Sequence, residues 1–99
     1  MAKIKFERSG GVVGQNINLD LDLDSLPASE SQHLLHLIQE SDFFNLPENL
    51  VATSTPDEFK YAIEVEAGAA RHSIHTSDTG APESLRPLLR ELSALAMVI

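Results

Sequence analysis

The stretch at residues 41–50, with two adjacent phenylalanines and a proline, divides the chain into two halves of similar design. Pro47 prevents a helix from continuing, because proline disfavours helical backbone at the preceding residue and has no N–H to donate. We expect at least one of Phe43 and Phe44 to seal the core between the preceding helix and a sheet. Each half holds two segments of alternating apolar and polar residues, then one with helical spacing. The sequence therefore predicts two successive strand–strand–helix units.

Four segments show the period-two alternation of half-buried strands. In the first of them, Ile4 and Phe6 point to one face while charged residues point to the other. Gly10 and Gly11 provide the turn after this strand, since glycine adopts a positive φ at little cost. The predicted strands cover residues 2–8, 12–23, 59–66 and 71–77.

Two further segments place leucines on one arc of a helix. The first is expected over residues 28–42, and the second over residues 82–96. Pro87 lies inside the second, so the regular helix there must begin near Ser84 or have a tight or kinked first turn. The apolar stripes are Leu34, Leu35, Leu37 and Ile38 in the first helix, and Leu85, Leu88, Leu89, Leu92 and Leu95 in the second.

This order predicts one α+β domain over residues 1–99, with a four-stranded antiparallel sheet in ββα-ββα order and both helices packed on one face. Sheet orders 2-1-3-4 and 1-2-4-3 both keep all neighbours antiparallel, so the order stays open. If each element runs back past its predecessor, the connections at residues 9–14, 43–58 and 77–83 meet at one end. Loops on a rigid scaffold often carry binding residues, so we expect the functional surface there.

Composition excludes several classes of function. Seven Lys and Arg residues against fifteen Asp and Glu give a formal net charge of -8, whereas nucleic-acid binding needs clustered basic residues. The absence of cysteine excludes disulfides and thiolate zinc sites and fits a reducing compartment, so we expect a cytoplasmic protein. The N-terminal residues lack the apolar core of a signal peptide, and no apolar run is long enough to cross a bilayer. We expect no nucleic-acid or membrane partner, and a monomer when the chain is free.

Three aspartates have the spacing that opens a calcium loop. Asp20, Asp22 and Asp24 match its first positions, but Ser25 and Ser31 stand where an EF-hand needs glycine and glutamate. Strand alternation explains the same pattern, so the solvated face of a strand is the favoured interpretation.

The histidines form no complete metal site. His33, His36 and Glu40 lie on one flank of the first predicted helix, where a solvated face is favoured over a metal site. His72 and His75 point to opposite faces of a strand, and His72 is expected to be a histidine at the rim of the core with a satisfied hydrogen bond. The chain also lacks the HExxH, GxSxG and glycine-rich phosphate motifs. We therefore expect neither an enzyme nor a cofactor.

Three motifs occur in a fixed order: ERSGG at residues 7–11, FFNLP at 43–47 and PESLRPLL at 82–89. With them the chain resembles the emfourin family, which are small bacterial proteins that inhibit protealysin and related thermolysin-like zinc metallopeptidases. The resemblance covers most of the chain and departs at residues 12–18, 67–70 and 97–99. It implies a cofactor-free inhibitor whose protein partner is a thermolysin-like metallopeptidase. The alternative is a protein-binding accessory module that contacts a peptidase without inhibiting it.

For such an inhibitor we expect the peptidase-binding surface where the topology brings the three connections together. Prolines in these loops lower the ordering cost of binding, and bulky apolar side chains suit a thermolysin-like cleft. Carboxylates at this end could reach the catalytic zinc, but occlusion of the cleft by the loops is the favoured mechanism. The predicted peptidase-binding residues are Gly10, Gly11, Val12, Leu46, Pro47, Glu48, Asn49, Leu50, Pro56, Asp57, Asp78 and Pro82.

Overall fold

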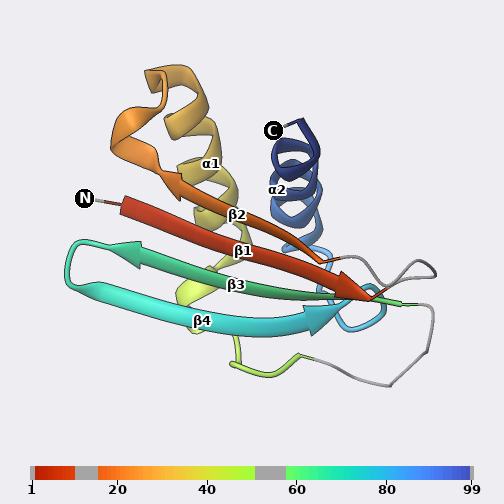
Figure 1. Cartoon of the computed structure of the whole chain (residues 1–99). Coiled ribbons are helices and arrows are strands. Elements are labelled where there is room, and N and C mark those ends of the chain that lie inside the picture. The colour runs from red at the N-terminus through yellow and green to blue at the C-terminus, as the bar shows by residue number, and fades with distance from the viewer. Residues whose placement is uncertain (1, 11–15, 51–57, 99) are drawn as a thin grey trace.

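The computed structural model describes residues 2–10, 16–50 and 58–98 (Figure 1). It has the predicted α+β class and the predicted ββα-ββα order, with a short 3-10 helix on each side of the first α-helix. The elements are β1 (Ala2–Gly10), β2 (Ile17–Asp22), η1 (Leu23–Ser25), α1 (Ala28–Ser41), η2 (Phe43–Asn45), β3 (Phe59–Ala67), β4 (Ala70–Ser77) and α2 (Arg86–Val98).

The four strands form one antiparallel sheet in the order β2-β1-β3-β4. Of the two orders that the sequence left open, the structure therefore adopts 2-1-3-4. Phe6 at the middle of β1 lies opposite Leu19 of β2 and Ile63 of β3, and Ile63 lies opposite Ile74 of β4. The apolar residues that alternate in each strand thus meet in one row on the same face.

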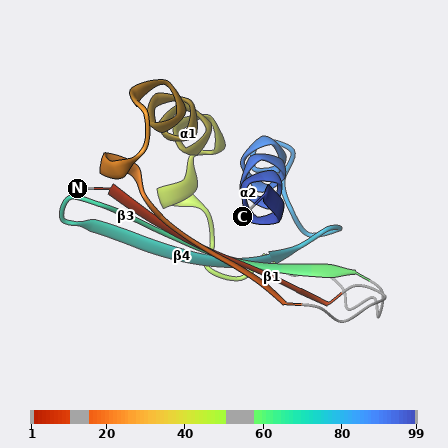
Figure 2. The same ribbon diagram turned by 45° about the horizontal axis from the view of Figure 1, so that its top comes forward.

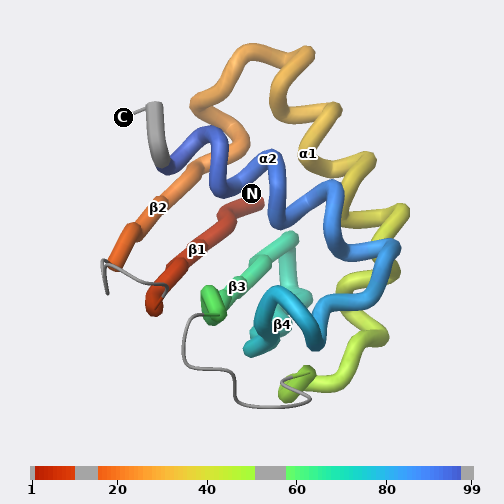
Figure 3. Tube along the Cα trace, turned by 90° about the vertical axis from the view of Figure 1, so that its right-hand side faces the viewer, coloured from red at the N-terminus to blue at the C-terminus, as the bar shows by residue number. Residues whose placement is uncertain are grey.

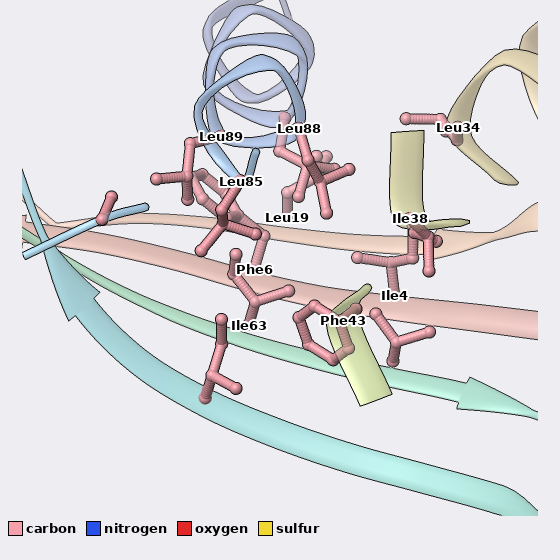
Figure 4. Packing of buried hydrophobic residues seen from close by; sticks show 14 of the residues in the cluster. Ile4, Phe6, Leu19, Leu34, Ile38, Phe43, Ile63, Leu85, Leu88 and Leu89 are labelled. Carbon is pink, nitrogen blue, oxygen red and sulfur yellow. The ribbon is translucent and has the colours of Figure 1, made fainter. Parts of the chain in front are cut away.

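Both α-helices cover this face, as predicted, and in the described part of the chain no element lies on the other face of the sheet (Figure 2). We call these the covered face and the open face. α2 crosses the sheet toward β2, and α1 lies beside it (Figure 3). Their buried side chains meet those of the strands in one apolar core (Figure 4). The core comprises Ile4, Phe6, Leu19, Leu23, Leu34, Ile38, Phe43, Ile63, Val65, Ile74, Ala81, Leu85, Leu88, Leu89 and Leu92.

α1 ends at an aspartate in the left-handed conformation. Asp42 has a φ of 55°, and its N–H donates to the carbonyls of Gln39 and Ile38, which satisfies two of the free carbonyls at the helix end. The reversal turns the next residue, Phe43, into the core, where it is 1% exposed. Phe44 is 39% exposed, so one phenylalanine seals the core and the other lies on the surface.

Some predicted boundaries were wrong. The second strand was expected over residues 12–23, but β2 is Ile17–Asp22 and Leu23 begins a 3-10 turn that the Asp22 carboxylate caps at Asp24 N. Residues 12–15 of the predicted strand lie outside the described residues. The last helix begins at Arg86 rather than at residue 82, which places Pro87 in the first turn. Backbone N–H groups in the first turn have no partner within the helix, so the N–H that proline lacks costs no hydrogen bond there.

Candidate functional site

The strand ends that open the first and third connections, and the strand start that closes the second, lie at one end of the sheet, as the topology predicted (Figures 1 and 3). β1 finishes at Gly10 opposite Phe59, the first residue of β3, and β4 finishes at Ser77 opposite Lys60. The turn from Ser77 to α2 begins at the same place. We call this region the loop end.

Asp78 ties the loop end together. Its carboxylate accepts hydrogen bonds from the Phe59 N–H at 3.0 Å and from the Tyr61 hydroxyl at 2.6 Å, one on each oxygen. Its own N–H donates to the Phe59 carbonyl at 3.2 Å, and its carbonyl accepts from Arg86 Nη2 at 3.2 Å. Burial of the Tyr61 hydroxyl, followed in importance by the bond to Asp78, raises the pKa of that side chain. Asp78 therefore fixes the turn after β4 to the start of β3, and both its oxygens are engaged inside the protein.

A second set of hydrogen bonds joins Glu58 to the same turn. We call the hydrogen bonds of Asp78 and those of Glu58 the two clamps. Glu58 is 6% exposed, and its Oε1 accepts hydrogen bonds from the N–H and the hydroxyl of Thr79. The turn is also held from β4, because the Ser77 hydroxyl accepts from the Gly80 N–H at 3.2 Å. Gly10 has a φ of 93°, and a Cβ there would lie 2.8 Å from the Glu58 carbonyl oxygen, so this close approach requires glycine.

The segment from Leu46 to Leu50 follows the outer edge of β4. His72 Nε2 lies 2.7 Å from the Leu46 carbonyl oxygen, the His75 N–H donates to the Glu48 carbonyl at 2.7 Å, and the Leu50 N–H donates to the His75 carbonyl at 2.7 Å. Asn49 and His75 form a parallel bridge. The segment thus satisfies backbone groups that an edge strand would otherwise leave unpaired.

Part of the predicted peptidase-binding surface therefore lies away from the loop end. Leu46 bonds to His72, which lies five residues before Ser77 on β4, a separation of about 17 Å along a strand. Leu46 and Leu50 are both half-buried and pack against the core. The expectation for His72 is confirmed, since it is half-buried, hydrogen-bonded and in edge contact with Phe43 at 5.6 Å between ring centroids.

The predicted site residues therefore fall into three groups. Gly10, Asp78 and Pro82 lie at the loop end, whereas the segment from residue 46 to residue 50 approaches it along β4. Gly11, Val12, Pro56 and Asp57 lie outside the described residues.

Sequence reasoning missed three residues that build the loop end: Glu58, Tyr61 and Thr79. The sequence placed Tyr61 on the inward face of a strand and Glu58 at the end of a loop. Their bonds join positions 17 and 21 residues apart, so no local spacing could have signalled them.

Among the described residues, two hollows lie on the strands. The larger, of about 570 Å³, is on the open face around Ala62, and carries side chains of both charge signs, such as Lys5 and Glu64. The other, of about 440 Å³, lies at the loop end on the covered face, between β1, β3 and α2. The second hollow adjoins Asp78 and Ala81, and so is continuous with the candidate surface.

Within the described residues, no group of three or more His, Asp or Glu side chains could hold a metal ion. His36 and Glu40 form an exposed i,i+4 pair at 3.4 Å, and His33 Nε2 lies 3.9 Å from Glu91. Both histidines thus lie on a solvated helix face. No helix in the described part of the chain is long and apolar enough to cross a membrane.

The fold and this surface define a small α+β protein whose loops are held by part-buried hydrogen bonds at one end of a half-covered sheet. The family model for emfourin matches residues 6–93, and the chain belongs to the emfourin family. A comparison with curated proteins found no match. Membership of this family suggests a metallopeptidase inhibitor with a peptidase as its protein partner, and argues against an enzyme.

Proposed function

We propose that this protein inhibits thermolysin-like zinc metallopeptidases of the protealysin type by placing its loop end in the active-site cleft. The hydrogen-bonded construction of the loop end carries this proposal. Asp78 and Glu58 hold the turn after β4 against the start of β3 before any partner arrives. A surface that is ordered in advance pays less conformational entropy on binding, and so retains more of its contact energy as affinity.

Occlusion of the cleft is the mechanism that this geometry favours. Both oxygens of Asp78 accept hydrogen bonds within the protein, so binding a zinc ion would require those bonds to break. Glu83 and Ser84 are exposed in the turn that leads into α2. They are placed to meet the wall of a cleft without taking part in the clamps.

Inhibition titrations with two tryptophan variants test this proposal. Ser84→Trp adds bulk at the loop end, and Ala69→Trp adds the same side chain at the exposed hairpin that joins β3 to β4, at the opposite end of the sheet. The unmodified chain should titrate a thermolysin-like peptidase at one-to-one stoichiometry. Ser84→Trp should raise the inhibition constant by about tenfold or more, since overpacking a close contact costs about 1–3 kcal/mol and about 1.4 kcal/mol is tenfold in an equilibrium constant. Ala69→Trp should change it by about twofold or less, as surface substitutions do.

The opposite ranking of the two variants would place the inhibitory surface at the hairpin end. Co-purification with a peptidase whose activity is not slowed would instead favour the alternative of a non-inhibitory accessory module. Circular dichroism on both variants controls for folding.

A further inference from the structure

The hollow at the loop end gathers positive charge on an acidic protein. Arg8 from β1 and Arg86 and Arg90 from the first turns of α2 all line it. They are three of only seven Lys and Arg residues in a chain with a formal net charge of -8. We call this hollow the arginine pocket.

These arginines form no ion pair within the described part of the chain. The ion pairs found there belong to Arg71, His33 and His36. Among the described residues that line the pocket, Asp78 is the carboxylate, and its oxygens accept from Tyr61 and Phe59. Arg86 and Arg90 are also four residues apart on α2, a spacing at which like charges destabilise a helix. The protein thus tolerates local repulsion at this place.

Two of the three guanidinium groups are held in position. The Arg8 guanidinium lies 4.4 Å from the centroid of the Phe59 ring, a cation–π contact. Arg86 Nη2 donates to the Asp78 carbonyl at 3.2 Å. Arg90 is exposed, and no described contact fixes its guanidinium. The aromatic ring of Phe59 and the side chain of Leu89 form part of the wall.

A carboxylate fits this combination of charge and shape. Planar guanidinium groups recognise carboxylates with paired N–H donors, and fixing the groups beforehand removes part of the entropic cost. The apolar wall suits the methylene stem of an aspartate or glutamate side chain. A hollow of about 440 Å³ accommodates such a side chain together with neighbouring atoms of its own chain.

We propose that the arginine pocket binds an aspartate or glutamate side chain on the surface of the target peptidase, beside its cleft. This inference rests on the proposed function and names a specific contact for it. The pocket adjoins the loop end, so it is covered when that end enters a cleft. Because the rest of the chain is strongly acidic, a local positive site would orient the inhibitor as it approaches an acidic patch.

Charge reversal at two arginines tests the pocket. Arg90→Glu and Arg71→Glu change the net charge equally, but Arg71 lies at the start of β4, at the other end of the sheet, paired with Glu66 at 2.7 Å. At low ionic strength Arg90→Glu should raise the inhibition constant by at least about tenfold, because it places two carboxylates together. Arg71→Glu should change it by about twofold or less. Arg90→Lys, which retains the charge, should recover most of the inhibition.

The salt dependence provides a second readout. The loss caused by Arg90→Glu should shrink between low and high ionic strength, since screening weakens charge interactions at the surface. Equal effects of Arg90→Glu and Arg71→Glu would refute the binding of an acidic side chain in the arginine pocket, but would not contradict the inhibitor function. An unmodified chain that inhibits no thermolysin-like peptidase would remove both proposals. Thermal unfolding of each variant confirms that the fold is retained.

Discussion

Substitution of Gly10 by alanine tests whether the loop end depends on a close backbone approach. Gly10 has a φ of 93°, and an added Cβ would lie 2.8 Å from the Glu58 carbonyl oxygen. The positive φ alone costs a residue with a Cβ about 1–3 kcal/mol, and relief of the contact by a backbone shift costs about 1–3 kcal/mol more. Alanine also makes the unfolded chain less flexible, which by itself raises the free energy of unfolding by about 0.4–1 kcal/mol. Together these contributions predict a loss of about 3 kcal/mol in the free energy of unfolding.

Gly68→Ala is the matched control. Gly68 also has a positive φ, of 61°, but a Cβ there would meet nothing within 4 Å. Only the backbone term applies, at about 1–2 kcal/mol before the same unfolded-state correction. The difference between the two variants therefore reports mainly on the contact between Gly10 and Glu58.

Urea unfolding gives the free energy and thermal unfolding gives the Tm of both variants, each followed by far-ultraviolet circular dichroism. For a domain of this size, 1 kcal/mol shifts the Tm by about 4–8 °C. We expect Gly10→Ala to lower the Tm by about 12–24 °C and Gly68→Ala by about 5 °C. A Gly10→Ala variant as stable as the unmodified chain, or a Gly68→Ala variant that is the less stable of the two, would refute the contact between Gly10 and Glu58 as a determinant of stability.

Two further predictions concern the two phenylalanines after α1 and the hydrogen bond between Tyr61 and Asp78. Phe43→Ala should lower the free energy of unfolding by about 3–5 kcal/mol, because Phe43 is almost fully buried. Phe44→Ala should cost less, about 1–2 kcal/mol, because Phe44 is 39% exposed but contacts the rings of Phe43 and His72. Similar losses in urea titrations of the two variants would contradict this assignment. Tyr61→Phe removes the hydrogen bond to Asp78 and should cost about 1–2 kcal/mol near neutral pH. Since the folded state raises the pKa of Tyr61 above its ordinary value of 10.0, the fold favours the protonated phenol, and this stabilisation is complete below pH 10 and is lost as the pH rises above it. Stability measured above that pH should therefore fall more steeply in the unmodified chain than in Tyr61→Phe, and parallel pH profiles would show that the hydroxyl is not protected.

The candidate site was predicted less completely than the fold. The convergence of the three connections followed from element directions alone, and Gly10, Asp78 and Pro82 do lie there. Leu46 lies instead beside the middle of β4. Residues 43–58 were expected to form one connection at the loop end. The edge of β4, however, offers backbone groups with which residues 48–50 pair. That competition depends on which strand ends up at the edge, so local sequence could not reveal it.

The sequence by itself determined the elements of this protein and their faces. Period-two alternation around Ile4 and Ile63, and helical spacing around Leu34 and Leu88, each encode a buried side that only one kind of element can present. Tertiary structure decided the rest. It chose β2-β1-β3-β4 from two orders with the same local pairing, and it buried Phe43 rather than its neighbour. It also joined Asp78 to Tyr61 and Glu58 to Thr79 at the loop end, because contacts between distant residues are fixed by packing of the whole chain rather than by the spacing of a few residues.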